Sequence, residues 1–239
     1  MDIILKISQE LMCRQEQVAA AVKLIDEGNT IPFIARYRKE ATGSLNDEQL
    51  RTLDERLTYL RGLEERKEKV IATIEEQGML TEELKQSILA AETLVAVEDL
   101  YRPYKPKRKT RATIAQSKGL TGLANIISLQ MTNKPITEEA LAYVSEEKEV
   151  HSPEEAIAGA MDIIAESISD NAEYRTEIRN RTMDKGVLIT TAKDLEAESV
   201  YEMYYEFEEP IKKLAGHRVL ALNRGEKEKI LTVKVNAPE

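Results

Sequence analysis

The stretch "NDEQLRTLDERLTYLRGLEERKEKVIATIEEQG", residues 46–78, decides the fold, because it carries the longest helical pattern in the chain. Its first leucines recur every three or four residues and so share one helix face: they are Leu50, Leu53, Leu57 and Leu60. Asn46 followed by Gln49 predicts a capping box at the start, and Gly78 predicts the end. About thirty residues would form a helix roughly 45–50 Å long. We call this long predicted helix the strut.

Charged residues interrupt the apolar stripe of this strut. Every position from Glu64 to Lys69 is charged, and apolar residues resume only at Val70, Ile71 and Ile74. A run of charge on a helix is typically solvated. We therefore expect part of the strut to stand in solvent.

Further helices are predicted on both sides of the strut from apolar spacing and cap residues. They are expected at about Gln15–Glu27, Ile114–Lys118, Leu120–Leu129, Thr137–Glu149 and Ala172–Thr182, with another beginning after Ser152, Pro153 and Glu155. The tail differs, because "GVLITT" suggests a short strand and His217–Val235 alternates as a β-hairpin would. The predicted fold is mainly α, an elongated multi-helix array with one strut and a small C-terminal β-hairpin. The expected division is 1–200, helical, and 201–239, aromatic segment and hairpin.

The composition favours a helical protein of the cytoplasm. Of the 239 residues 42% are hydrophobic and 32% charged, and Cys13 is the single cysteine. One cysteine forms no internal disulfide, which suits a reducing compartment. No apolar run is long enough to span a bilayer. We expect a soluble, cytoplasmic chain without a membrane partner.

The residues that usually carry catalysis are few and scattered. His151 and His217 have no acidic or thiol partner at a recognisable spacing, and we interpret each as a cap-flanking or strand-edge residue. Arg14 beside Cys13 could lower the pKa of its thiol, but a structural cysteine is commoner. No Gly-rich phosphate loop and no metal-ligand cluster is visible in the sequence. The prediction is a protein that is not an enzyme and has no cofactor.

A basic strip is the strongest sign of a binding function. The net charge is −9, yet 100–137 contains no Asp or Glu and eight Lys or Arg. Extended, proline-rich chain with cations can follow a phosphate backbone, and a tyrosine can stack on a base. The candidate nucleic-acid contacts are Tyr104, Lys105, Lys107, Arg108, Lys109 and Arg111. The alternative, a solvated linker paired with acidic helices of its own chain, stays open.

Two aromatic segments have simpler interpretations. "GNTIPFIARYRKEATGSLNDEQL", residues 28–50, is predicted to be first a connector, anchored by Phe33, Ile34 and Tyr37. Its cations form a second-rank contact surface: Arg36, Arg38 and Lys39. Near the C-terminus, aromatic residues are predicted to form core beneath the hairpin: Tyr204, Tyr205 and Phe207.

Four stretches carry a family resemblance. "IPFIARYRKEATGSLNDEQL", "EEQGMLTEEL", "VEDLYRPYKPKRKTRATIAQSKGL" and "HRVLALNRGE" follow one another as in the Tex family of bacterial transcription accessory proteins. That family is similar to the core of a eukaryotic transcription elongation factor. The resemblance implies an N-terminal helical region with helix-turn-helix-like elements. In the family, YqgF-like, helix-hairpin-helix and OB-fold RNA-binding domains follow, so we expect this chain to be a fragment of a longer protein.

The expected function combines the basic strip with the resemblance. It is a non-catalytic scaffold that helps a Tex-like transcription factor engage nucleic acid, RNA or DNA, and the transcription machinery. The remaining domains of the full-length protein are expected partners as well. The alternative is a helical protein–protein interaction scaffold with no direct nucleic-acid contact.

Overall fold

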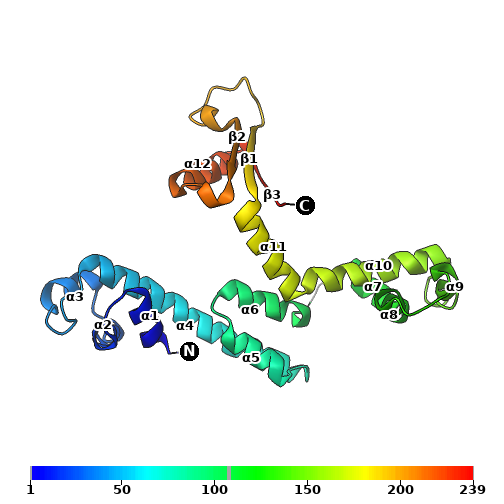
Figure 1. Ribbon diagram of the computed structural model, residues 1–239, viewed down its shortest axis with the longest axis horizontal. Coiled ribbons are helices and arrows are strands. Elements are labelled where there is room, and N and C mark those ends of the chain that lie inside the picture. The colour runs from blue at the N-terminus through cyan, green and yellow to red at the C-terminus, as the bar shows by residue number, and fades with distance from the viewer. Residues whose placement is uncertain (1, 107–108, 239) are drawn as a thin grey trace. The chain divides into compact units, whose positions relative to one another are not determined.

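The computed structural model describes residues 2–106 and 109–238. The predicted mainly helical class is confirmed, and the β-structure is one small three-stranded antiparallel sheet near the C-terminus (Figure 1). The chain divides into two compact units, Met1–Pro106 and Lys107–Glu239. The boundary at residue 200 stays a prediction. None of the described helices combines the length and apolar character that a membrane span requires.

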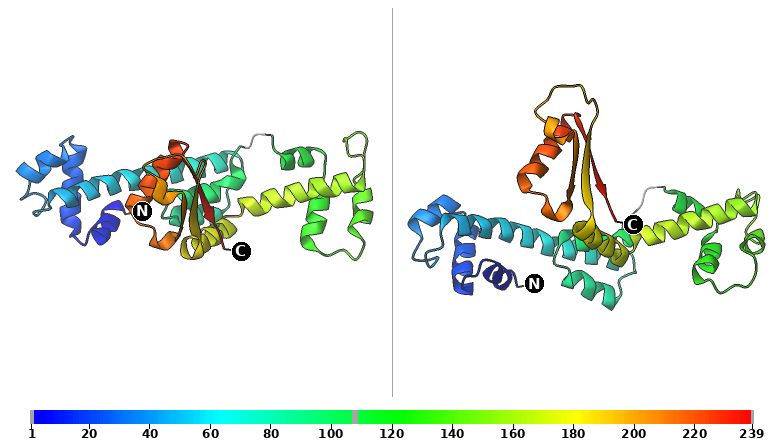
Figure 2. Two further views of the ribbon diagram at one scale, coloured as in Figure 1. Left: turned by 90° about the horizontal axis from the view of Figure 1, so that it is seen from above. Right: turned by 45° about the horizontal axis from the view of Figure 1, so that its top comes forward.

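The first unit is built on the predicted strut, helix α4 (Asp47–Glu76), which is continuous in Figure 2. The other helices of the unit are α1 (Ile3–Glu10), α2 (Gln15–Asp26), α3 (Ile31–Tyr37), α5 (Glu82–Ala90), α6 (Leu94–Tyr101) and the 3₁₀ turn η1 (Arg102–Tyr104). Helices α1, α2, α3, α5 and α6 all contact α4. The strut is therefore the common partner of the unit.

Both ends of α4 follow the predicted signals. The Asn46 side chain accepts a hydrogen bond from the Gln49 backbone N–H at 2.8 Å, and the Gln49 side chain accepts one from Asn46 N–H at 3.0 Å. Gly78 has a φ of +69°, the left-handed conformation that glycine adopts at little cost where a helix ends. The leucine stripe lies in the core of the unit.

The prediction that the charged run stands in solvent is wrong at its centre. The Lys67 side chain is 1% exposed, and Leu63 and Val70 beside it are buried too. Its ammonium donates to the Leu89 carbonyl at 2.9 Å and pairs with Glu64 at 2.8 Å. Leu89 lies in the last turn of α5, where carbonyls lack helical partners and attract cations. The long aliphatic stem lets a lysine continue the buried stripe.

Lys67→Ala should destabilise the first unit by about 3 kcal/mol, because it removes a buried cation from its partners and leaves a cavity. The measurement is the loss of helical circular dichroism in urea. The matched control is Lys69→Ala: Lys69 pairs with Glu65, but both side chains are more than 60% exposed. That change should cost no more than about 0.5 kcal/mol. Equal effects of the two substitutions would contradict the structural role of Lys67.

Two arginines of α4 clamp the preceding helices. Arg56 donates twice to the Glu10 carboxylate, at 2.6 and 2.8 Å, and Arg61 donates twice to Asp26, at 2.7 and 2.8 Å. Bidentate pairs of this kind fix geometry as well as charge. The hydrogen bonds from Arg56 lower the pKa of the Glu10 carboxyl, and those from Arg61 lower the pKa of Asp26. Helices α1 and α2 are thus tied to α4 electrostatically.

Glu10→Gln should lower stability at pH 7 and have progressively less effect as the pH falls. The folded pKa of Glu10 lies below its unfolded value, so the carboxylate stabilises the fold fully above about pH 4.3. That contribution disappears as the pH falls through the folded pKa. Urea midpoints of the wild type and the variant, measured from pH 7 to pH 3, should converge. Glu68→Gln, at an exposed site on α4, is the control and should show no such convergence.

The second unit begins with a helical part centred on α10 (Pro153–Asp170). Its other helices are α7 (Arg111–Ser117), α8 (Thr121–Leu129), α9 (Ile136–Leu141) and α11 (Ala172–Lys185), so the predicted 137–149 helix is shorter than expected. The start of α10 is as predicted, because Ser152 caps it by accepting from Glu155 N–H at 3.2 Å. A Cβ on Gly159 would lie 2.4 Å from a methyl group of Leu120. The glycine allows α10 to approach the segment that leads into α8.

The sheet completes the second unit. Its strands are β1 (Val187–Ala192), β2 (Glu206–Pro210) and β3 (Leu231–Asn236), in the order β2-β1-β3, all antiparallel. Helix α12 (Gly216–Lys227) and the 3₁₀ turns η2 (Glu202–Tyr204) and η3 (Ile211–Lys213) accompany it. The aromatic core predicted here is confirmed: Tyr204 and Tyr205 are buried and Phe207 packs against them.

The predicted hairpin over His217–Val235 is wrong in its first half, which forms α12. Leu222 is buried on the side of α12 that packs against the sheet core. Gly225 is not the turn, because it lies within α12 and is buried there. The chain turns at Lys229, whose φ is +63°. The short run of alternating residues is compatible with either structure, and packing on the sheet selects the helix.

Candidate nucleic-acid interface

Helix α3 packs on the core of the first unit through Ile34, which has no exposed surface, with Ile31 and Ala35 partly buried beside it. Phe33 and Tyr37 were predicted to anchor the helix with it, and this is wrong. They are 37% and 62% exposed, and their ring centroids lie 5.3 Å apart. Residues four apart are neighbours on a helix, so these two rings form a pair beside the buried contact. The α3 segment is both a connector and an aromatic surface.

The turn after α3 is held in one conformation. Thr42 is fully buried, and its hydroxyl lies 3.3 Å from the carbonyls of both Arg38 and Lys39. Gly43 has a φ of +59°, and its carbonyl accepts from the Gln17 side chain at 2.7 Å. A side chain at residue 43 would therefore be strained and would collide with Gln17. The backbone that carries Arg38 and Lys39 is fixed by contacts with α2.

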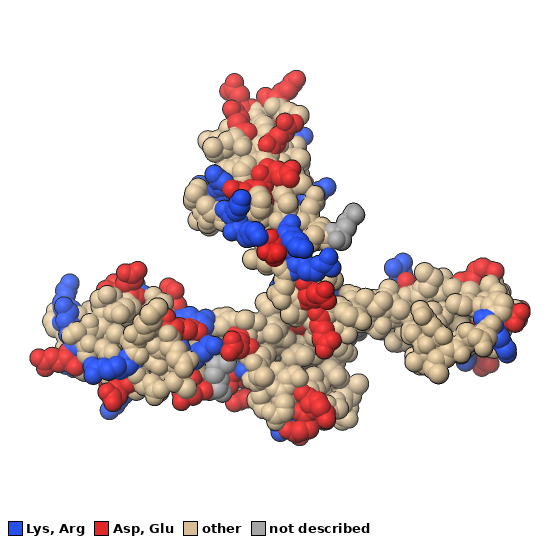
Figure 3. All heavy atoms as spheres, viewed as in Figure 1, with Lys and Arg blue, Asp and Glu red and all other residues tan. Residues whose placement is uncertain are grey.

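Three cations lie close to the ring pair in the sequence. Arg36, Arg38 and Lys39 are exposed and form no ion pair with any residue in the described part of the chain. The Arg38 guanidinium lies 5.4 Å from the centroid of the Phe33 ring, a cation–π distance. Figure 3 shows basic and acidic side chains interspersed at the end of the first unit that holds α3. We call the surface formed by Phe33, Arg36, Tyr37, Arg38 and Lys39 the α3 patch.

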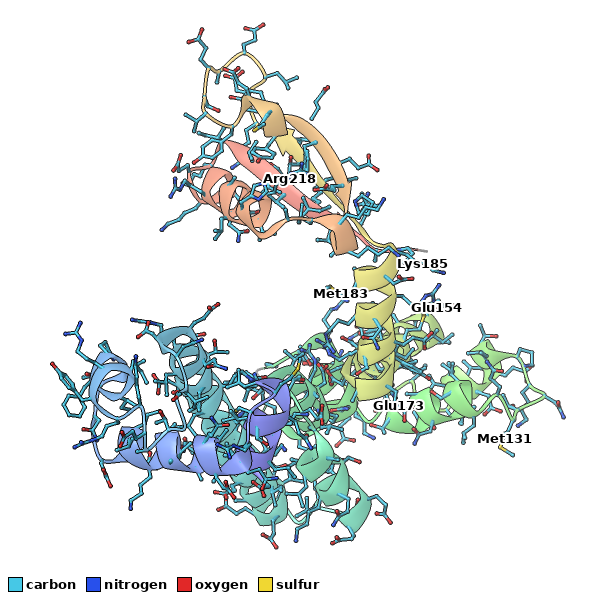
Figure 4. The ribbon with its side chains drawn as sticks, turned by 60° about the vertical axis from the view of Figure 1, so that its left-hand side comes forward. Met131, Glu154, Glu173, Met183, Lys185 and Arg218 are labelled. Carbon is cyan, nitrogen blue, oxygen red and sulfur yellow. The ribbon has the colours of Figure 1, made fainter. Side chains whose placement is uncertain are left out.

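Two basic residues near the sheet differ from those of the α3 patch, because they form ion pairs with acidic side chains. Arg218, labelled in Figure 4, reaches from α12 to the Glu209 carboxylate on β2. Hydrogen bonding to Glu209 raises the pKa of Arg218. Lys212 pairs with Asp184 at 2.9 Å. Paired cations of this kind have less charge to offer a phosphate.

The start of the basic strip is docked onto the first unit. Tyr104 is half-buried against the core of that unit, and its carbonyl accepts from the Gln77 side chain at 3.0 Å. Lys105 is exposed, with its ammonium 4.0 Å from the Glu98 carboxylate, which also accepts from Arg66 at 2.6 Å. The face of Tyr104 that packs on the core is therefore closed to a stacked base.

The rest of the strip belongs to the second unit. Lys107 and Arg108 lie outside the described residues. Lys109 is exposed and pairs with no acid in residues 2–106 or 109–238. Arg111 is 86% exposed, with Asp162 at 3.4 Å. Lys109 and Arg111 are thus accessible cations.

The two histidines considered as catalytic candidates both lie near the start of a helix. The His151 backbone N–H donates to Glu155 at 2.9 Å, which confirms the cap-flanking interpretation. His217 lies in the first turn of α12, two residues after the N-cap Ala215, which fits the cap-flanking alternative and excludes the strand edge. Within the described ranges, no three His, Cys, Asp or Glu side chains are placed to hold a metal ion together.

Cys13 should react slowly with thiol reagents. It is half-buried, and burial raises the pKa of its thiol, contrary to the effect that Arg14 could have had. Less thiolate is then present at neutral pH than for an exposed cysteine. The rate of alkylation by iodoacetamide, measured from pH 7 to pH 10, should keep rising above pH 9. A plateau below pH 8 would contradict the raised pKa.

Two family models match most of the chain. The Tex-like protein N-terminal domain matches residues 1–75, and the Tex central region-like model matches residues 130–239. The chain belongs to the Tex family. The first match contains the α3 patch and most of α4, and the second contains α10 and the sheet.

Relatives of this Tex-family chain match it nearly end to end. The YdcI protein of Bacillus subtilis (strain 168) is 50% identical over 98% of this chain and 33% of its own length. The transcriptional accessory protein Tex of Neisseria gonorrhoeae is 42% identical over 98% and 31%. The S1 RNA-binding domain-containing protein 1 of Homo sapiens is 31% identical over 91% and 22%. The chain therefore spans about a third or less of these relatives.

Proposed function

We propose that this Tex-family chain is a non-catalytic scaffold that contacts nucleic acid through the cations of the α3 patch. One observation carries the proposal: Arg36, Arg38 and Lys39 are exposed and unpaired with described residues, Arg36 on helix α3 and the other two on the turn held by Thr42 and Gln17. The second-rank surface is the basic strip: Tyr104, Lys105, Lys107, Arg108, Lys109 and Arg111. The structure thus favours the reverse of the order that the sequence suggested.

Local charge matters more than the net charge of −9. At physiological salt, charges interact over about 8 Å, so a phosphate at the α3 patch responds mainly to the cations beside it. Each cation that meets a phosphate releases condensed counterions, and this release supplies affinity. Pre-organised cations also lose less side-chain and backbone freedom on binding. A fixed cluster of three is therefore a suitable phosphate-backbone contact.

The relatives support this assignment. One is named a transcriptional accessory protein and another an S1 RNA-binding domain-containing protein. Because this chain spans about a third or less of each, engagement of the transcription machinery and of further domains is part of the proposal. A cytoplasmic location belongs to it too. The role assigned to this region is to position the assembly on RNA or DNA.

A protein–protein interaction scaffold without nucleic-acid contact is the second candidate. It is favoured by the acids near two strip cations: Glu98 near Lys105 and Asp162 near Arg111. Cations of the strip that lie near acidic side chains of the same chain attract phosphates less strongly. The α3 patch has no such acids within ion-pair distance among the described residues.

Replacing Arg36, Arg38 and Lys39 together by Gln should weaken binding of a fluorescein-labelled single-stranded RNA by about tenfold or more at low salt. The slope of log affinity against log salt should fall by about 2, since each lost phosphate contact removes about 0.7. The measurement is fluorescence anisotropy across a salt series. The matched control replaces Lys23, Arg51 and Lys69, exposed cations on other helices of the same unit, by Gln.

A parallel set, Lys107→Gln, Arg108→Gln and Lys109→Gln, tests the strip. Loss of affinity only in this set would move the contact surface to the strip. If neither set weakens binding more than the control does, the nucleic-acid proposal is wrong and the protein–protein scaffold is favoured.

A further inference from the structure

We infer that the Phe33–Tyr37 ring pair is a base-stacking platform that makes the α3 patch selective for single-stranded nucleic acid over duplex. The inference rests on the proposed function and adds the class of ligand. The cations alone would bind the phosphate backbone of a single strand or of a duplex. The rings would add the preference for a single strand.

The tyrosines of this chain differ widely in exposure. Tyr201, Tyr204 and Tyr205 are each at least nine-tenths buried, whereas Tyr37 is 62% exposed. Exposed aromatic surface forgoes the stabilisation of about 25 cal/mol per Å² that burial provides. Phe33 and Tyr37 forgo part of it although Ile34, between them in the sequence, is completely buried. Burying these two rings would remove more apolar surface from water, so their exposure is not explained by the hydrophobic effect.

The two rings have different surroundings. Arg38 lies over Phe33 at 5.4 Å, so one face of that ring is occupied. The interplanar angle of 46° between the rings leaves Tyr37 tilted and not stacked flat against Phe33. Tyr37 has no cation–π partner among the described residues. Tyr37 is therefore the ring with a face available to a base, and Phe33 supports it from the preceding turn.

Stacking requires a base whose face is accessible. In a duplex the base faces lie against neighbouring base pairs, and a ring on a protein surface does not reach them unless the helix is opened. In a single strand every base has a face that an aromatic side chain can take up, with little dependence on sequence. Rings next to fixed cations are the combination that single-strand binding surfaces use. The ligand class that fits the α3 patch is single-stranded RNA or DNA.

The rigidity of the joint adds to the selectivity. Tyr37 is the last residue of α3, and the turn after it is fixed by Thr42 and by the bond from Gln17 to Gly43. The ring and the cations on both sides of it are therefore held in register before binding. A strand that crosses the patch can place a base on Tyr37 while its phosphates meet Arg36 or Lys39.

The test compares Tyr37→Ala with Tyr37→Phe on matched ligands. The probes are a labelled 20-nucleotide single-stranded oligouridine, the equivalent oligothymidine, and a duplex of the same length, measured by anisotropy. Tyr37→Ala should lower single-strand affinity about tenfold and leave duplex affinity and the salt slope unchanged. Tyr37→Phe keeps the ring and should retain the affinity of the wild type. Tyr174→Ala, at a 50% exposed tyrosine on α11, is the control.

Photocrosslinking adds a direct readout. 5-Bromouridine in the single strand should crosslink to Tyr37 in the wild-type chain, with the site mapped by mass spectrometry. Circular dichroism checks that each variant keeps its helices, which is expected because neither ring of the pair is buried. Crosslinks that map elsewhere would overturn the assignment of the platform.

The outcomes separate this inference from the proposed function. If the Gln variants of the α3 cations weaken binding while Tyr37→Ala behaves like Tyr174→Ala, the stacking platform is wrong and the phosphate contact stands. Equal losses on single strand and duplex would also overturn the platform. If neither the cations nor the ring matters, the proposed function itself fails.

Discussion

Eight side chains of α4 form one buried row, and the first unit depends on it. Seven are aliphatic and the eighth is Lys67, whose ammonium reaches the Leu89 carbonyl on α5. The row spans both the helices that precede α4 and those that follow it. If only part of this row were buried, the remaining aliphatic side chains of α4 would be exposed to water, which is unfavourable. Lys67 allows the row to continue through the most charged part of the sequence.

The same row explains why α3 can present its rings to solvent. Seven residues are too few to form a stable helix in water, so α3 depends on its contact with α4. Ile34 makes that contact, and the turn closed by Thr42 and Gln17 fixes the direction in which the chain continues. Phe33 and Tyr37 are then not needed to hold the joint. The side of α3 that packs on the core therefore leaves Phe33 and Tyr37 exposed.

Local signals were enough to predict much of this fold. The capping pair Asn46–Gln49 and the leucine spacing of α4 are set by residues three or four apart, which a sequence shows directly. Lys67 could not be predicted in this way, because its partner carbonyl is 22 residues away and belongs to another helix. The hairpin predicted for the α12 segment was wrong for a similar reason. Its short alternating run suits a strand or a helix, and the packing of Leu222 in the core of the sheet decides between them.

The candidate site was predicted in part. Arg36, Arg38 and Lys39 are visible as cations in the sequence, but their lack of acidic partners is a property of the surrounding helices. Phe33 and Tyr37 looked like core because they share a helical side with Ile34. A helix face is wider than the strip that a single neighbour can cover, so apolar residues at its edge remain outside. In α3 this edge also carries cations that pair with no acid among the described residues, next to a turn held by contacts with α2, so core packing alone does not account for its composition.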